Sequence, residues 1–228
     1  KALTMTHKQK FNGLFNRKAL LCLRGFSLVE MAVVLLIIGL IAGSVLKGQQ
    51  LIENAKLTTI VSQIRTCETA YATFFSTYNA HPGDFQDAKD SLDDILENGD
   101  GDGVISGNGF EGESLQFWQH LSRAGLLSIE PLTGTPDFGH GVPSTKFGGG
   151  ITVTYDNTDE SHWFVIGARH GTSGQGALFT PQQAQFIIQK LNGSVKAMEG
   201  QGASGKCLIN QKLNLKNKKT ACILYVKF

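Results

Sequence analysis

One carboxylate stands inside a long apolar segment of this sequence. Glu30 is the only formally charged residue between Phe26 and Leu46. An acidic side chain at the centre of a membrane-spanning helix costs about 2.5 to 3.5 kcal/mol, so a chain that keeps one there is expected to supply it with a partner. We therefore interpret Glu30 as a functional carboxylate that pairs with a positive charge.

A second group of oxygen-bearing side chains has the spacing of a calcium-binding loop. In residues 98–105 these side chains alternate with glycines, in the order of the first eight places of an EF-hand loop. The three candidate ligands are Asn98, Asp100 and Asp102. The twelfth place is Gly109, so further ligands would come from Glu111, Glu113 or elsewhere. The sequence predicts calcium as a cofactor here, and a glycine-rich acidic surface turn is the alternative.

The start of the apolar segment resembles a known processing site. Arg24 and Gly25 precede the residues Phe26–Glu30, which read FSLVE, and the long apolar run follows. This order resembles the cleavage site of type IV prepilins and of the pseudopilins of type II secretion. The resemblance implies cleavage by a prepilin peptidase after Gly25 and methylation of the new amino group of Phe26. It also implies that Glu30 pairs with the N-terminal amine of a neighbouring subunit during assembly, which makes both charges tolerable in lipid.

The charges that flank the apolar segment predict its orientation. Six cations and no Asp or Glu precede it: Lys1, Lys8, Lys10, Arg17, Lys18 and Arg24. The positive-inside rule places this end in the cytoplasm and the rest of the chain outside. Residues 26–46 would span about 31 Å, the thickness of a bilayer core, and are too long for the apolar region of a signal peptide. An uncleaved membrane anchor remains the simplest alternative.

Removal of a leader, residues 1–25, would change the charge and the cysteine content. The chain would keep 15 Lys and Arg against 19 Asp and Glu, a net charge of −4, without the basic character typical of nucleic-acid binding proteins. In an exported, oxidising setting, and with Cys22 removed, Cys207 and Cys222 are the natural disulfide pair. Their position also resembles the disulfide-bounded C-terminal region of many type IV pilins. Cys67 is then the odd thiol, which we interpret as a buried small hydrophobe.

The spacing of apolar residues predicts the elements that position these groups. From Leu57 to Tyr78 they recur alternately three and four residues apart, the stripe of an amphipathic helix. Residues 26–79 contain no proline, so we expect one continuous helix, with residues 26–46 crossing the membrane. Residues 80–228 would form one globular domain. The fold class expected is α+β and pilin-like, with an antiparallel sheet packed on the exposed half of the long helix.

Local signals predict the elements of that domain. Ser114 is expected to cap a helix over residues 114–121, and a Thr180–Gln183 capping box to open another. A hairpin is expected over residues 151–155 and 162–166, with further strands around residues 207–209 and 221–226.

No arrangement of residues in the sequence indicates catalysis, so we expect no enzyme. The histidines lack zinc-ligand spacing. Residues 169–171 are only weakly similar to the phosphate-binding triplet of histidine phosphatases, and we interpret them as a surface turn. Four lysines fall between Cys207 and Cys222 and indicate either a solvated turn or a docking patch for an acidic partner or DNA: Lys212, Lys216, Lys218 and Lys219.

These patterns predict a structural subunit of a type IV pilus. It would be a single-pass precursor in the bacterial inner membrane and would enter a periplasmic or extracellular filament after processing. Its partners would be other pilin subunits, the prepilin peptidase, the inner membrane and the filament assembly machinery. A pseudopilin of a type II secretion system is the alternative that shares the processing site. A membrane-anchored, calcium-dependent binding protein that does not polymerise is the alternative of another class.

Overall fold

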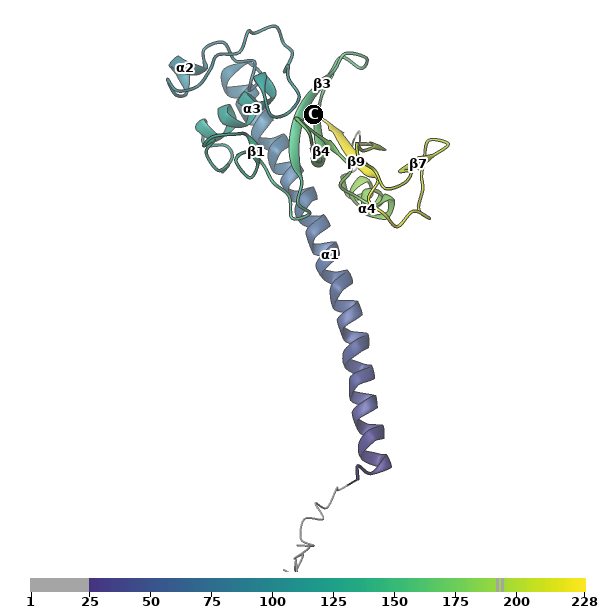
Figure 1. The fold of residues 1–228 in the computed structure, drawn as a ribbon. Helices are drawn as coiled ribbons and strands as arrows, with labels where there is room; N and C mark the ends of the chain where they lie inside the picture. The colour runs from purple at the N-terminus through teal and green to yellow at the C-terminus, as the bar shows by residue number, and fades with distance from the viewer. Residues whose placement is uncertain (1–24, 192, 194) are drawn as a thin grey trace, which may run out of the picture. The chain divides into compact units, whose positions relative to one another are not determined.

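The computed structural model describes residues 25–191, 193 and 195–228 (Figure 1). The leader predicted for residues 1–25 therefore lies outside the described residues, except for Gly25. The chain divides into two compact units, with the boundary between Gly48 and Gln49. Helix α1 (Leu28–Tyr78) contributes residues to both units. The predicted helix, residues 26–79, matches α1 to within two residues at each end.

The first unit contains the apolar part of α1. None of its side chains from Leu28 to Leu46 is buried within the chain, and Leu28 is 90% exposed. The most apolar 18-residue window of α1 has a mean hydropathy of 2.5, which makes this helix long and apolar enough to cross a membrane. By length and composition, no other helix in the described part of the chain meets that criterion.

The second unit includes the remainder of α1, whose apolar stripe packs into the core. Its buried residues are Leu57, Ile60, Val61, Ile64, Cys67, Ala70 and Phe74. The predicted stripe is confirmed at five of these positions. The helix ends at Asn79, which adopts a left-handed conformation with φ 49°. The sequence placed the start of the globular domain at residue 80, whereas packing places the helix from Gln49 onward in the same unit as the sheet.

An antiparallel sheet forms the other side of this unit, with the strand order β3-β4-β9-β6. Strands β3 (Gly150–Asp156) and β4 (Ser161–His170) form the predicted hairpin. Strand β9 (Cys222–Lys227) pairs with β4 on one edge and with β6 (Val195–Glu199) on the other. The short strand β5 (Ser173–Gly176) pairs with β4. Of residues 169–171, predicted as a surface turn, Arg169 and His170 belong to β4 and only Gly171 lies in the turn before β5.

Short elements complete the unit. Helix α4 (Pro181–Leu191) begins at the predicted capping box, in which the Thr180 N–H donates to Gln183 Oε1 and the Gln183 N–H to Thr180 Oγ1. The remaining elements are α2 (Ala88–Ser91), β1 (Asp137–Phe138), β2 (Gly141–Val142), β7 (Leu208–Ile209) and β8 (Lys212–Leu213).

Helix α3 (Gly112–Arg123) begins earlier than the sequence indicated. Its N-cap residue is Glu111, so the assignment of Ser114 as the cap is wrong. The Ser114 hydroxyl instead donates to the Glu111 carbonyl at 2.9 Å and accepts the Gly109 N–H at 2.8 Å. Ser114 thus fixes the turn before the helix.

Aromatic side chains join the helices to the sheet. Phe117 of α3 lies edge-on to Phe164 of β4, with ring centroids 5.9 Å apart. Phe228 stacks on Phe164 at 3.9 Å and meets Tyr71 of α1 at 4.6 Å. Burial of this cluster, with each aromatic ring covering a large apolar area, holds α1, α3 and the sheet together.

Candidate functional site

The start of α1 brings together the residues predicted for processing and assembly. Ser27 caps the helix: its Oγ accepts the Val29 N–H at 3.1 Å, and its own N–H donates to Glu30 Oε2 at 2.8 Å. This reciprocal pair is a capping box. Gly25, Phe26 and Glu30 are all exposed here, Phe26 to 76%. The sequence analysis missed the cap, although a serine followed three residues later by glutamate is its usual signature.

In this geometry the Glu30 carboxylate can cap its own helix and also bind a cation. One oxygen satisfies a backbone N–H that has no partner within the helix, and the negative charge lies at the positive end of the helix dipole. The other oxygen, Oε1, accepts no hydrogen bond from the described part of the chain. Glu30 can therefore cap its own helix and still receive a cation.

A second cluster lies in the globular unit, where three carboxylates meet. Single oxygens of Asp84, Asp100 and Asp102 lie within 4.8 Å of one another. Asp84 is 4% exposed, and the other two are exposed. Asp84 Oδ1 accepts the N–H groups of Gly101 at 2.5 Å and Asp102 at 3.1 Å, and Oδ2 accepts that of Gly103 at 2.8 Å. One buried carboxylate therefore gathers the glycine-rich loop around itself.

The electrostatics of this cluster disfavour three negative charges in the absence of a cation. Burial raises the pKa of Asp84, the N–H groups of Gly103 and Gly101 partly offset this, and the nearby Glu113 and Asp100 raise the pKa further. Three carboxylates are ligands of the kind that a hard divalent cation such as calcium takes. These residues would hold such an ion.

The structure brings together only part of the predicted calcium ligand set. Asp100 and Asp102 lie together with Asp84, which was not among the predicted ligands. Asn98 Oδ1 accepts the Lys89 N–H at 2.9 Å. Glu111 Oε1 accepts a hydrogen bond from Asn108 at 2.8 Å.

Glu113, also predicted as a ligand, lies near this cluster and holds the loop. It is 7% exposed and its carboxylate accepts the N–H groups of Asp100 at 3.1 Å and Ser106 at 2.9 Å. Glu113 therefore supports both ends of the loop from the first turn of α3.

Two buried histidines also form hydrogen bonds to the backbone of this acidic segment. His120 Nδ1 accepts the Gly83 N–H at 2.9 Å, and its Nε2 lies 3.2 Å from the Glu97 carbonyl, to which it donates. His162 Nε2 accepts the Ile105 N–H at 3.1 Å. Burial lowers the pKa of His120 to about 4, and burial together with the neighbouring His81 lowers that of His162 to about 4. Both rings are neutral hydrogen-bonding groups near neutral pH.

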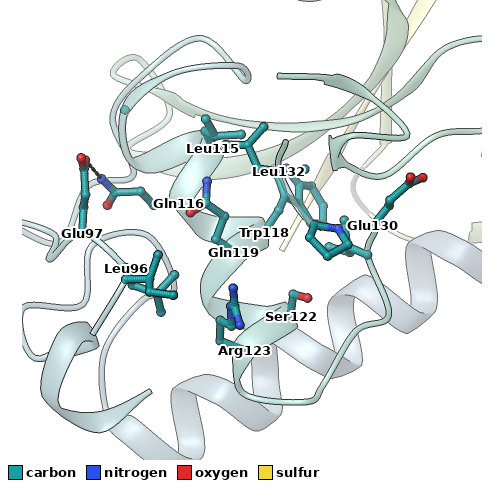
Figure 2. A pocket seen from close by; sticks show the side chains of 15 residues that line it. Leu96, Glu97, Leu115, Gln116, Trp118, Gln119, Ser122, Arg123, Glu130 and Leu132 are labelled. Atoms are coloured by element: carbon teal, nitrogen blue, oxygen red, sulfur yellow. Dashed lines mark hydrogen bonds between the residues drawn. The ribbon is translucent and has the colours of Figure 1, made fainter. Parts of the chain in front are cut away.

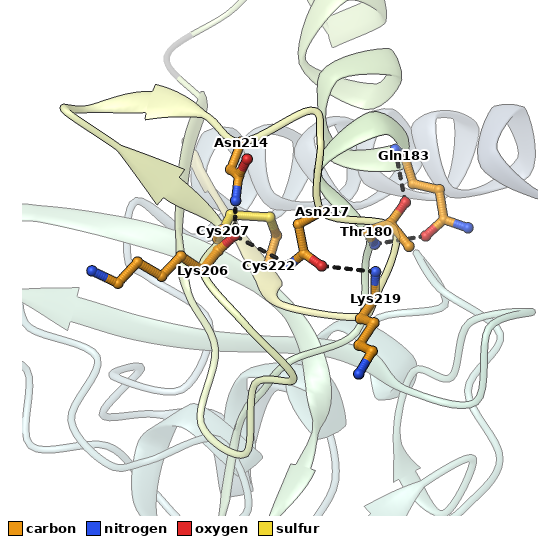
Figure 3. Close-up of a disulfide and its surroundings, with 8 residues drawn as sticks. All are labelled: Thr180, Gln183, Lys206, Cys207, Asn214, Asn217, Lys219 and Cys222. Atoms are coloured by element: carbon orange, nitrogen blue, oxygen red, sulfur yellow. Dashed lines mark hydrogen bonds between the residues drawn. A yellow bond between two sulfur atoms is a disulfide. The ribbon is translucent and has the colours of Figure 1, made fainter.

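The predicted disulfide is present. Cys207 and Cys222 are bonded, both are fully buried, and the segment between them carries the four lysines (Figure 3). Asn214 and Asn217 each donate to the Lys206 carbonyl at 3.2 Å, and the Lys219 N–H donates to Asn217 Oδ1 at 3.0 Å. The lysine side chains are exposed.

Cys67 is buried and free, as interpreted from the sequence. Burial raises the pKa of its thiol to about 12. Because the thiolate is the reactive form, this cysteine is a packing residue.

No family model matches the chain, and comparisons with curated proteins and with solved structures find no match. What the chain does must then be inferred from its own residues.

Proposed function

We propose that this chain is a structural subunit of a type IV pilus, made as an inner-membrane precursor, cut after Gly25 and polymerised through its N-terminal helix. The observation that carries the proposal is the position of Glu30. It is the only charge between Phe26 and Leu46, a stretch that no described part of the chain covers, and it lies in the first helical turn, close to Gly25 and Phe26. Such a carboxylate is costly in lipid unless a cation meets it.

In this proposal the cation is the methylated N-terminal amine of Phe26 in a neighbouring subunit. Glu30 keeps its bond to the Ser27 N–H and offers Oε1 to the incoming amine. Pairing of the two charges favours subunits that enter in one register, because any other register leaves both unpaired in lipid.

Two substitutions at Glu30 test the proposal. Gln at this position can still accept the Ser27 N–H, as in a Ser-x-x-Gln capping box, but has no charge, whereas Ala loses both. If the charge serves assembly, Glu30→Gln and Glu30→Ala both reduce the amount of subunit recovered in sheared filaments. Glu199→Gln, at an exposed position of β6, is the matched control. Normal recovery of the Glu30→Gln variant would limit the role of Glu30 to capping.

Processing gives a separate test. The mature N-terminal peptide is expected to begin with methylated Phe26, as measured by mass spectrometry of the sheared fraction. A Cβ at Gly25 meets no atom within 4 Å, so a substitution there leaves the fold intact. We expect Gly25→Ala to be processed far better than Gly25→Leu. A mature chain that still begins upstream of Gly25 contradicts the proposal.

The same N-terminal features suit a pseudopilin of a type II secretion system. Recovery in surface filaments favours a pilus subunit, and loss of exoprotein secretion on deletion favours a pseudopilin. The cluster of Asp84, Asp100 and Asp102 supports a further proposal, that the globular unit binds calcium. With calcium binding but no cleavage, the chain would be a membrane-anchored, calcium-dependent binding protein that does not polymerise.

A further inference from the structure

A cavity of about 500 Å³ opens in the second unit, beside α3. Its walls come from α3, from residues 95–97 and from the loop 129–132 (Figure 2). Aliphatic side chains in its lining include Leu96, Leu115 and Leu132. The volume falls in the range of sites that take small molecules or short peptide segments.

Two buried polar atoms in the lining have no partner. Trp118 is fully buried, and its indole N–H has no acceptor in the described part of the chain. Gln116 Oε1 has no donor there, although its Nε2 donates to Glu97 at 3.1 Å. Only one other buried side-chain atom of the described residues, in Gln63, is unpaired. Unpaired buried groups are costly, so a ligand that supplies a carbonyl and an N–H would stabilise this wall.

The loop beside the cavity has free backbone groups. Among the described residues, the backbone of 128–135 makes a single hydrogen bond, in which the Glu130 carbonyl accepts the Gly141 N–H at 3.0 Å. The other N–H and C=O groups of this loop have no protein partner. An extended peptide can pair with such a segment in the manner of an added strand.

The charges at the rim select among ligands. Glu97 and Glu130 are exposed, and the cation in the lining, Arg123, already pairs with Asp93 at 2.9 Å. His140 Nε2 lies 4.0 Å from Glu130 Oε1, so Glu130 already attracts a basic group. The rim therefore favours a cationic ligand over an anionic one. The apolar part of the walls is mainly aliphatic, and the one aromatic side chain in the lining, Trp118, is buried. An aliphatic side chain therefore fits better than a sugar ring, which prefers an exposed aromatic face.

We propose that this cavity binds a short extended segment of another protein, with an aliphatic side chain inside the cavity and a basic side chain beside Glu97 and Glu130. The peptide backbone pairs with the loop 129–132 and supplies groups to Trp118 and Gln116. This inference goes beyond the proposed filament function and is independent of it, because every residue involved belongs to the second unit.

Fluorescence of Trp118 tests the proposal in the full chain in detergent micelles. Trp118 and Trp163 are the two tryptophans, so Trp163→Phe isolates the signal. The probe is acetyl-Gly-Leu-Gly-Lys-amide, in which Leu and Lys lie on the same side of an extended chain, and we expect it to shift the emission saturably. Replacing Leu by Ser or Lys by Glu in the probe should weaken binding by about tenfold or more. The NMR signal of the Trp118 indole proton in the unmodified chain gives a second readout that does not need the Phe substitution.

Substitutions at the rim of the cavity test whether Glu130 contacts the basic side chain of the ligand. Glu130→Gln should weaken binding of the Lys probe by about fivefold and leave a neutral Gly-Leu-Gly-Gly probe unchanged. Glu160→Gln, at an exposed site far along the sequence, is the matched control. An equal response to all probes, or none, overturns the proposal. So does saturable self-association of the chain that Glu130→Gln abolishes, because the occupant is then a second copy.

Discussion

The two parts of helix α1 share a secondary structure but differ in what covers them. From Leu28 to Leu46 the side chains are apolar on every face apart from Glu30 and Ser44, and none is buried by the described part of the chain. From Gln49 to Tyr78 one stripe is buried in the core, and charged residues such as Lys56 and Arg65 occupy the exposed faces. A helix that is apolar all round needs an environment from outside, whereas an amphipathic helix is completed by its own domain.

This contrast separates what the two parts contribute. Burial of the stripe stabilises the globular unit, so changes there should alter its unfolding. The apolar part adds nothing to that unit's core, so changes there should alter insertion and assembly instead.

The largest expected effect comes from one substitution made in both parts. Ile64 is fully buried and Ile37 is 48% exposed. Ile64→Ala should lower the unfolding free energy of the globular unit by about 2 to 5 kcal/mol, because it removes buried methyl groups and leaves a cavity. Ile37→Ala should leave it unchanged. Chemical unfolding in detergent micelles, followed by circular dichroism, measures both, and equal losses would remove the contrast.

Lowering the pH should destabilise the globular unit because His120 becomes protonated. Its pKa is about 4 in the folded chain against an ordinary value of 6.5, so the unfolded chain binds more protons between these values. The stabilisation is therefore complete above about pH 6.5 and is lost as the pH falls toward 4, by about 3 kcal/mol. The pKa of His162 is also lowered to about 4, so this residue adds to the loss of stability in acid.

Unfolding measured from pH 7.5 to pH 4 tests this expectation. NMR titration of the His120 ring identifies the group. The matched control is His170→Asn, at an exposed site, which should keep the loss of stability in acid. A stability that stays constant across this window would contradict the neutral role assigned to His120.

Calcium should stabilise the globular unit and not the apolar part of α1, because its predicted ligands all lie in the globular unit. At a hundredfold excess over its Kd, a bound ion stabilises by about 2.7 kcal/mol. The melting temperature should therefore be higher in calcium than in chelator, and Asp100→Asn with Asp102→Asn should abolish the difference. Magnesium should substitute poorly, since it demands a smaller octahedral site.

Two control variants separate the loss of calcium binding from damage to the loop itself. Asp94→Asn, an exposed acid outside the cluster, should keep the calcium response. Asp84→Asn should destabilise the unit even in chelator, because Asp84 also accepts three backbone N–H groups. Equal melting of the unaltered chain in calcium and in chelator would leave the loop as an acidic turn.

The smallest effect compares the two capping boxes. Thr180→Ala should lower the unfolding free energy of the globular unit by about 1 kcal/mol, because the first turn of α4 loses its cap. Ser27→Ala removes the equivalent cap from α1 and should leave that unfolding unchanged. A loss with Ser27→Ala as large as that with Thr180→Ala would show that the helix start contributes to the globular unit.

Local sequence patterns were sufficient to predict the elements that are determined by residues close together in the sequence. The three-and-four spacing from Leu57 to Tyr78 predicted the buried stripe, and Thr180 with Gln183 predicted the start of α4. Strand β6 was missed because Val195–Glu199 carries little alternation, and its pairing with β9 joins segments distant in sequence. That pairing is a tertiary effect that overrides weak local preference.

The acidic cluster was predictable only in part, for the same reason. Asp100 and Asp102 are two residues apart, so a motif finds them. Asp84 joins them only because the chain returns, with Glu113 and His120 holding the loop from α3. Asn98 fits the motif by position, but the Lys89 N–H already uses its side-chain oxygen.

The place of β9 in the sheet has a consequence for biosynthesis. Strand β9 is made after all the other strands of the sheet, yet it lies between β4 and β6. While residues 171–221 are being translated, the apolar strand β4 keeps a free edge, and such edges are templates for wrong pairing. The sheet is therefore completed only once β9 has been made, and until then the edge of β4 is open to wrong pairing.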